Sequence, residues 1–238
     1  ALSWAGELDR PMACDFLSKW PTLDRIKRAR PDTIASFYRQ HGCRHRKVIE
    51  KRLEEICTAR ALTQDTAVME TSVVIVQTIV RTLRPLLESI ERIEQDIKRR
   101  FDAHPDKAIF ESFPGAGAVI APRLQAAMGS DRSRFASAEE VQKYSGIAPV
   151  TRRSGKKTWV HRRFACPKFL KQSFHEFAGH SIRWSLWARA YYDKKRGEGK
   201  GHHAAVRALA YKWIRIIHRC WKDRVPYSEE TYLESLKA

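Results

Sequence analysis

The chain has 238 residues and carries 45 lysine and arginine side chains against 27 aspartate and glutamate side chains, a formal net charge of +18. Such an excess of positive charge indicates a polyanionic partner. Hydrophobic residues make up 43% of the chain and aromatic residues 10%, which is enough for a packed core and excludes a wholly disordered basic tail. The length fits one or two domains.

The positive charge is concentrated in the second half of the chain. Residues 109–238 contain 25 basic and 11 acidic side chains, a net charge of +14, whereas residues 1–108 have a net charge of +4. No acidic residue occurs between Glu140 and Glu176, although nine lysines and arginines fall there. A solvated helix normally mixes charges of both signs, so we expect the second half to carry the anion-binding surface.

The cysteines and the hydropathy pattern indicate in which cellular compartment the protein is located. Five cysteines at irregular spacing form no C-x-x-C pair, which is typical of a reducing cytosol. Cys43 lies between His41 and His45, but the second ligand pair of a zinc motif is missing, so we expect no metal site. No uninterrupted apolar run reaches about 18 residues and no signal peptide opens the chain, so we expect a soluble cytoplasmic protein with no membrane partner.

The first part of the chain is expected to be helical. Residues 1–45 are interrupted by prolines and by Gly42, which predicts short helices and a linker. Residues 46–104 are predicted to form a long, coiled-coil-like helical arm, in which Pro85 should kink or interrupt the helix at Arg84. Seven aliphatic residues in this arm step alternately by three and four: Val76, Ile79, Leu83, Leu86, Ile90, Ile93 and Ile97. They indicate either two antiparallel helices within one chain or a homo-oligomer contact through residues 76–97.

A second domain is expected over residues 109–230, followed by a tail at 231–238. Apolar helical segments flank a glycine-rich turn near residue 115, and the capping-box spacing of Ser137 and Glu140 predicts a helix that ends at Gly146. Two short strands, 148–153 and 158–163, are expected to pair as a hairpin.

The rest of this domain is expected to be helical. Apolar residues stepping from Leu170 to Tyr191 predict one helix with an aromatic face, and a basic glycine-rich loop follows at 194–201. A last long helix should bury residues from Val206 to Cys220. The predicted fold class is therefore mainly α: a helical arm, then a mostly helical domain with a helix-hairpin-helix-like motif and a short β-hairpin.

The glycine-rich turn is the first candidate site. In Pro114-Gly115-Ala116-Gly117, two glycines permit a tight turn that leaves backbone N–H groups open at a helix N-terminus, where phosphate binds well. This pattern resembles the hairpin of a helix-hairpin-helix motif, which grips a nucleic-acid backbone without reading bases. A plain structural turn is the alternative. A dinucleotide site lacks support, because the third glycine and a preceding strand are missing.

The second candidate site is the segment Arg152-Arg153-Ser154-Gly155-Lys156-Lys157. Its four cations would favour alkoxide character on Ser154 and neutralise the charge of a phosphoryl transition state, while Gly155 would let the hairpin tip approach a phosphate. Arg162 and Arg163 add cations at the end of the second expected strand, and His161 is the one histidine expected near the tip. The alternative is an ordinary Ser-Gly turn whose cations only contact phosphates.

Aromatic residues are interleaved with basic ones throughout the second domain. Rings in this context can stack on unpaired bases, although at helical spacing most of them are expected in the core.

Five ordered motifs in residues 109–230 resemble the C-terminal transposase domain of the insertion-sequence "one-ten" and "eleven-eleven" transposases. The arm at 46–103 also resembles the coiled-coil region of that family. The motifs are Phe113-Pro-Gly-Ala-Gly117, Arg134-Phe-Ala-Ser-Ala-Glu-Glu140, Tyr144-Ser-Gly-Ile-Ala-Pro149, Ser154-Gly155-Lys156, and Ala190-Tyr-Tyr192 with Lys200-Gly201 and Ala205 to Lys212.

The resemblance implies DNA strand cleavage and exchange through a covalent phosphoserine, guided by a structured bridge RNA, in the bacterial cytoplasm at the nucleoid. The family's serine falls on Ser154. The family also has an N-terminal domain whose acidic tetrad binds Mg²⁺, and no such tetrad is visible here, because Glu7, Asp9 and Asp15 lie in a helical and turn context. We therefore expect a C-terminal fragment of such a transposase, with no cofactor in this chain.

Three functions remain open from the sequence. The first is a transposase or recombinase fragment that binds DNA and a guide RNA. The second is a non-catalytic helix-hairpin-helix nucleic-acid-binding module. The third is an RNA-binding assembly protein held together by its helical arm.

Overall fold

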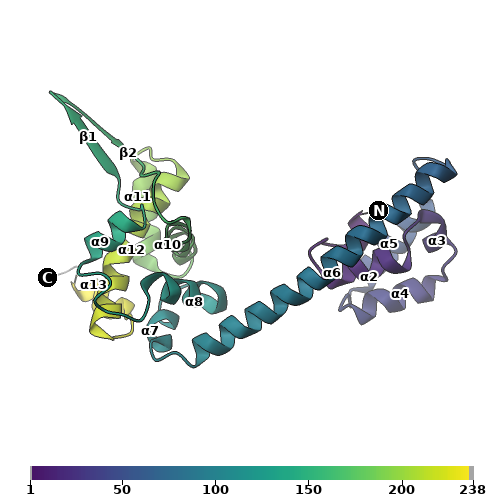
Figure 1. Ribbon diagram of the computed structural model, residues 1–238, viewed down its shortest axis with the longest axis horizontal. Helices are drawn as coiled ribbons and strands as arrows, with labels where there is room; N and C mark the ends of the chain where they lie inside the picture. The colour runs from purple at the N-terminus through teal and green to yellow at the C-terminus, as the bar shows by residue number, and fades with distance from the viewer. Residues whose placement is uncertain (1, 236–238) are drawn as a thin grey trace. The chain divides into compact units, whose positions relative to one another are not determined.

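The computed structural model describes residues 2–235, with side chains described for residues 4–234. The chain divides into two compact units at the boundary between Gln95 and Asp96. The described residues form helices and one antiparallel pair of strands, so the predicted mainly α fold with a short β-hairpin is confirmed (Figure 1).

Unit 1 is built from short helices that pack around a cluster of aromatic rings. Pro11 and Pro31 each occupy the start of a helix, where proline's missing N–H costs no hydrogen bond. The rings of Phe16, Phe37 and Tyr38 are buried at the centre. The helices are α1 (Leu2–Ala5), α2 (Pro11–Lys19), α3 (Leu23–Lys27), α4 (Pro31–Gln40), α5 (Arg46–Thr58) and the first part of α6 (Thr66–Asp102). Helix α5 packs on α3 and α4, and its Ile49 and Ile56 join the same core.

Helix α6 passes through Pro85 without a break, so an interruption at Arg84 is wrong, whereas the alternative of a kink there stays a prediction. Proline removes one backbone hydrogen bond, but the turns on both sides of it propagate cooperatively and outweigh that loss. The guanidinium of Arg84 also pairs with the Asp15 carboxylate of α2 at 2.6 Å, which anchors the helix at this point. This pairing and a hydrogen bond from His41 lower the pKa of Asp15 although burial opposes them.

The apolar residues of α6 form an exposed stripe. Ile79, Leu86, Ile90 and Ile93 are each about half exposed, so neither unit covers them. By length and composition alone α6 is apolar enough to cross a membrane. Charged residues such as Arg81 lie on its other faces, and this amphipathic pattern is typical of a helix that packs against another helix. We call Val76, Ile79, Leu83, Leu86, Ile90 and Ile93 the α6 stripe.

Unit 2 is organised around α12. Leu209, Trp213 and Ile217 on this helix are completely buried, and α9, α10 and α11 pack directly against it. The predicted last long helix is therefore confirmed. The other elements are α7 (Lys107–Glu111), α8 (Gly117–Met128), α9 (Ala138–Tyr144), β1 (Val150–Ser154), β2 (Lys157–His161), α10 (Lys168–Ser181), α11 (Leu186–Gly197), α12 (His202–Asp223) and α13 (Glu229–Ser235).

The segment from Leu170 to Tyr191 forms two helices, α10 and α11, so the prediction of one continuous helix is wrong. Ser185 is the cause at the start of α11: its Oγ accepts a hydrogen bond from the backbone N–H of Ala188, as an N-cap does. The spacing of three and four residues continues across the break in the sequence, but the residues on either side of it belong to two separate helices. Helix α11 also extends to Gly197, so much of the expected glycine-rich loop is helical.

The start of α9 agrees with the sequence analysis. The Ser137 hydroxyl accepts from the Glu140 N–H at 3.3 Å, and the Glu140 carboxylate accepts from the Ala136 N–H at 2.8 Å. The helix ends before Gly146, whose φ of 73° is one that glycine adopts without steric cost.

The segment after α12 returns across unit 2 and closes its core. The Tyr227 N–H donates to the Ser112 hydroxyl, and its own hydroxyl accepts from Trp187 Nε1, both at 2.8 Å. The Glu229 carboxylate then accepts from the Ser185 hydroxyl and the Leu186 N–H at the start of α11. Residues 231–235 of the expected tail are the end of α13, and residues 236–238 lie outside the described part of the chain.

A largely buried ion pair near the start of unit 2 predicts an acid-sensitive stability. Two guanidinium nitrogens of Arg132 donate to the Asp106 carboxylate at 2.6 and 2.7 Å, and Asp106 is only 5% exposed. These hydrogen bonds lower the pKa of Asp106 below its ordinary 3.8. Because the folded pKa is depressed, the stabilisation is fully present above about pH 4 and is lost as the pH falls further.

We therefore predict that Asp106→Asn lowers the free energy of unfolding by about 3 kcal/mol at pH 7, and that the difference from the parent shrinks below pH 4. Urea unfolding followed by circular dichroism at both pH values measures this. Asp223→Asn is the control, because Asp223 pairs with Arg219 only at 3.6 Å on the surface, and it should cost less than about 1 kcal/mol. An Asp106→Asn midpoint equal to the parent at pH 7 would contradict the prediction.

Candidate nucleic-acid interface

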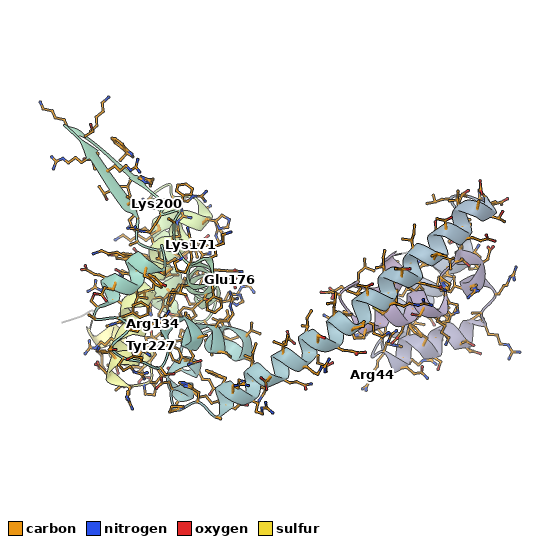
Figure 2. The ribbon with its side chains drawn as sticks, viewed as in Figure 1. Arg44, Arg134, Lys171, Glu176, Lys200 and Tyr227 are labelled. Atoms are coloured by element: carbon orange, nitrogen blue, oxygen red, sulfur yellow. The ribbon has the colours of Figure 1, made fainter. Side chains whose placement is uncertain are left out.

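The β-hairpin projects from the helical body of unit 2, and its tip extends beyond the helices (Figures 1 and 2). Ser154 pairs with Lys157, so Gly155 and Lys156 alone form the turn. Gly155 has a φ of 56°, which a type II′ turn requires at its first central position. No other atom lies within 4 Å of the place where a Cβ would stand at Gly155, so the tip is open to an approaching ligand.

The strand register determines which side chains share a face with Ser154. Directly paired residues of an antiparallel ladder point to the same face, and successive residues point to opposite faces. Because Ser154 pairs with Lys157 and Arg152 pairs with Trp159, these four side chains share one face. Arg153 lies on the other face. The four cations of the sequence motif are thus divided between two faces and the turn.

The Ser154 hydroxyl and the cations of the hairpin motif are unpaired with respect to the side chains that the structure describes. Among the described residues, no group forms a hydrogen bond with that hydroxyl, and the four cations of the motif form no ion pair with an acidic residue. All of these residues are exposed. Four uncompensated positive charges therefore surround an exposed hydroxyl at the hairpin tip.

His161 lies at the opposite end of the hairpin from Ser154, so the expectation that it stands near the tip is wrong. It pairs with Val150 at the root, four residues along the strand from Lys157. Four strand residues span about 13 Å. Proximity in the sequence was misleading here, because the turn reverses the chain before His161 is reached.

Arg162 and Arg163 follow β2 at the hairpin root and differ in environment. Arg162 is exposed, and its guanidinium carbon lies 4.7 Å from the centre of the Phe164 ring. Arg163 is half-buried, and its Nε atom is buried without a hydrogen-bond partner among the described residues. Its backbone carbonyl accepts from Lys171 Nζ at 2.9 Å, which ties the loop after β2 to α10.

The glycine turn lies between α7 and α8 in the helical body, not on the hairpin. Gly115 and Gly117 both have positive φ, 78° and 54°. A Cβ at Gly115 would lie 2.6 Å from Trp184 Cδ1 and 3.3 Å from the backbone of His180, so only glycine fits there. Gly117 and the next two residues are exposed, and no side chain caps α8. The first turn of α8 therefore presents free N–H groups to solvent.

The helix-hairpin-helix motif itself stays a prediction. Pro114 is half-buried at the start of the turn, and Phe113 just before it is buried in the core. This buried ring fixes the turn to unit 2, which is compatible with a structural as well as a binding role.

An open groove of about 700 Å³ at the hairpin root was not anticipated from the sequence. It is lined by residues of α9, the segment before it and the loop after β2, among them Arg134, Tyr144 and Arg163. Arg134 and Tyr144 were noted only as parts of family motifs, and no local pattern brings them together with Arg163. Arg134 is labelled in Figure 2.

No metal centre is formed within the part of the chain that the structure describes. No three His, Cys, Asp or Glu side chains there are grouped so that they could hold an ion. His41 instead uses both ring nitrogens in hydrogen bonds of 2.9 Å, to the Phe37 carbonyl and to Asp15. The described residues therefore do not fit a Mg²⁺ site.

Residues 107–193 match the model of the family described as "Transposase IS116/IS110/IS902 family". The chain is 33% identical to the IS117 mini-circle protein of Streptomyces coelicolor over 152 residues. The matched region covers 64% of this chain and 37% of that protein. It is 28% identical over 217 residues to the 42 kDa protein of insertion element IS900 of Mycobacterium paratuberculosis, covering 91% of this chain and 54% of the relative. The 44.8 kDa IS116 protein of Streptomyces clavuligerus is 32% identical over 143 residues, with coverages of 60% and 36%. The chain thus spans about a third to a half of the length of the curated relatives it matches.

The two positive-φ glycines of the turn predict different sensitivities to alanine. Each substitution places an L-residue in a left-handed conformation, at a cost of about 1–2 kcal/mol. Gly115→Ala must also displace the Trp184 ring, whereas Gly117→Ala meets no atom. We therefore expect the lower urea midpoint for Gly115→Ala, measured by tryptophan fluorescence. Equal midpoints for the two variants would show that Trp184 does not restrict this turn.

Proposed function

We propose that this chain is part of the DNA transposase of an insertion element and supplies Ser154 as the nucleophile for DNA strand cleavage and exchange. The match of residues 107–193 to a transposase family supports the class of reaction. The observation that carries the role of Ser154 is its position: an exposed hydroxyl without a partner at the tip of a projecting hairpin, with Arg152 and Lys157 on the same face.

The chemical step follows from that arrangement. The Ser154 oxygen attacks the phosphorus of a DNA phosphodiester and loses its proton, while the bond from phosphorus to one sugar oxygen breaks and that oxygen is protonated. The product is a phosphoserine ester, which a second strand end can attack in the reverse sense. Arg152 and Lys157 lie where they can neutralise the charge that develops on the phosphoryl oxygens.

The other basic groups serve to hold the nucleic acid. Arg153 faces away from Ser154, and Lys156 lies in the turn. Arg162 and Arg163 lie at the hairpin root. These four side chains therefore suit contacts to phosphates next to the reacting one. The turn at Pro114, Gly115 and Gly117 offers backbone N–H groups to a phosphate at the start of α8. Gly155 allows close approach at the tip.

A structured guide RNA and a cytoplasmic, nucleoid-associated location complete the proposal. The net charge of +14 on residues 109–238 provides more basic surface than one hairpin needs, which supports a second polyanion. Mg²⁺ is assigned no role in this chain, because the described residues hold no suitable cluster.

The chain is further proposed to form a homo-oligomer through residues 76–97. Support comes from the exposed α6 stripe, whose spacing of three and four matches the contact seam of a coiled coil. A second copy of α6 is the occupant that this repeat fits, because two identical stripes can interlock along their length.

The alternative function is a non-catalytic nucleic-acid-binding module that uses the glycine turn and the basic hairpin. The same exposed cations favour it, and it differs from the proposal only in making no covalent bond. Separate measurements of binding and of covalent attachment distinguish the two.

We predict that Ser154→Ala, in a full-length protein that contains this segment, lowers strand exchange by about 10³-fold or more. It should also abolish the protein–DNA adduct seen on denaturing gels. Binding of duplex DNA should change less than about twofold, because the cations remain. Strand exchange or an adduct that persists in Ser154→Ala would eliminate Ser154 as the nucleophile and favour the binding module.

The companion variant replaces Arg152, Arg153, Lys156 and Lys157 with glutamine. It should weaken duplex binding and reduce the slope of log K against log salt by about 3 to 4, one unit for each lost phosphate contact. Unchanged affinity and slope would overturn the assignment of the hairpin as a DNA contact.

We predict that sedimentation shows a dimer or larger species for the parent chain and a monomer for the double variant Ile90→Glu with Ile93→Glu. Burying two carboxylates in the contact seam is unfavourable. Val74→Glu is the matched control, because Val74 is exposed on α6 outside the stripe, and it should associate like the parent. A parent chain that sediments as a monomer at tens of micromolar contradicts the proposal.

A further inference from the structure

The groove at the root of the β-hairpin has the size and lining of a binding site that neither the hairpin nor the glycine turn accounts for. It measures about 700 Å³ and opens to solvent between the end of α9 and the loop that follows β2. Phe135 and Tyr144 supply aromatic rings, and Ala165, Cys166 and Pro167 supply an apolar wall. A purine or pyrimidine base is far smaller than this volume, so the groove has room for a base together with part of its backbone.

The aromatic wall is suited to stacking. Tyr144 is 51% exposed, and its ring centre lies 6.0 Å from that of Phe135 at an interplanar angle of 52°. Phe135 is buried, so the Tyr144 ring packs against a fixed neighbour. An exposed ring held by a buried one offers a flat face at little cost in side-chain entropy.

The groove is already formed in the free chain. A Cβ at Gly146 would lie 2.4 Å from the Sγ atom of Cys166, so the loop after β2 packs directly on the end of α9. The Lys171 ammonium holds the same loop through the Arg163 carbonyl. These two contacts fix the loop that forms one side of the groove, one to the end of α9 and the other to α10.

The charges around the groove favour a phosphate-bearing occupant. Arg134, Lys143 and Arg163 line it, against the single carboxylate of Glu140. One oxygen of Glu140 already accepts from the Ala136 N–H, so this carboxylate is partly engaged within the chain. The Arg163 Nε atom is buried without a partner. Arg163 also forms no ion pair with an acidic side chain of the described residues, so its charge is uncompensated beside the groove.

We propose that this groove binds one unpaired nucleotide of the DNA strand that the hairpin contacts, with its base stacked on Tyr144 and its phosphate held by Arg163 and Arg134. This inference rests on the proposed DNA-binding function and adds a site to it. Four strand residues separate the hairpin root from Ser154, a span of about 13 Å.

The test compares fully paired DNA duplexes with duplexes that carry one unpaired 2-aminopurine. The parent chain should bind the unpaired form at least about fivefold more tightly and quench the fluorescence of its 2-aminopurine, because base–aromatic stacking has this magnitude. Tyr144→Leu should lose both the preference and the quenching while binding paired duplex within about twofold of the parent. Tyr144→Phe should retain both.

Two further variants distinguish binding in the groove from the effect of removing any exposed aromatic ring. Phe169→Leu is the matched control, because Phe169 is a similarly exposed ring in unit 2 that does not line the groove, and it should behave like the parent. Ala165→Trp fills the groove and should abolish the preference with the Tyr144 ring intact. Circular dichroism confirms that each variant is folded.

The outcomes distinguish the two proposals. Tight binding of paired duplex without any preference for the unpaired form overturns the groove site and leaves the proposed function standing. A preference that survives both Tyr144→Leu and Ala165→Trp overturns the groove site in the same way. Quenching that occurs only with an unpaired RNA nucleotide overturns the assignment to DNA. Absence of binding to every duplex overturns the proposed function and the groove site together.

Discussion

The packing around the Trp213 indole is the interaction on which the rest of unit 2 depends. The ring is completely buried on α12, and its Nε1 donates to the buried Ser181 hydroxyl at the end of α10 at 2.8 Å. Four aromatic rings from different segments surround it at centre-to-centre distances of 4.6 to 6.2 Å: Phe113, Phe177, Trp187 and Tyr227. Phe113 directly precedes the glycine turn, so the ring that organises the core also fixes the proposed phosphate-binding turn. A cavity at Trp213 would loosen four segments at once.

The β-hairpin, by contrast, does not depend on a packed core. Its tip extends beyond the helices, and two strands alone gain little stability in water. Uncompensated cations at Arg152, Arg153, Lys156 and Lys157 repel one another until a polyanion is bound. The hairpin thus has less local stability than the helical body, and its cations are accessible to a polyanion. The helical body holds the hairpin root in place, for example through the hydrogen bond from Lys171 of α10 to the Arg163 carbonyl.

Local signals in the sequence predicted local structure well. Ser137 and Glu140 predicted the start of α9 because a capping box needs only neighbouring residues, and the periodicity from Val206 to Cys220 predicted α12. The predictions were wrong or incomplete where strand pairing or tertiary contacts determine the structure. Helix α6 continues through Pro85, and the neighbouring Arg84 pairs with Asp15, 69 residues away in the sequence, a contact that no local pattern encodes. The faces of the hairpin and the groove at its root depend on register and on loop packing, which no periodic pattern encodes.

The return of the chain at Tyr227 has a consequence for the order of events during synthesis. Its N–H pairs with the hydroxyl of Ser112, 115 residues earlier, and its ring packs on Phe113 and Trp213. The core behind the glycine turn therefore cannot close until Tyr227 has been synthesised, long after the hairpin residues. A nascent chain that stops after α12 carries the basic hairpin without a finished support. Completion of the body that holds the hairpin thus depends on the segment from Tyr227 to Glu229, which lies far from the hairpin in the sequence.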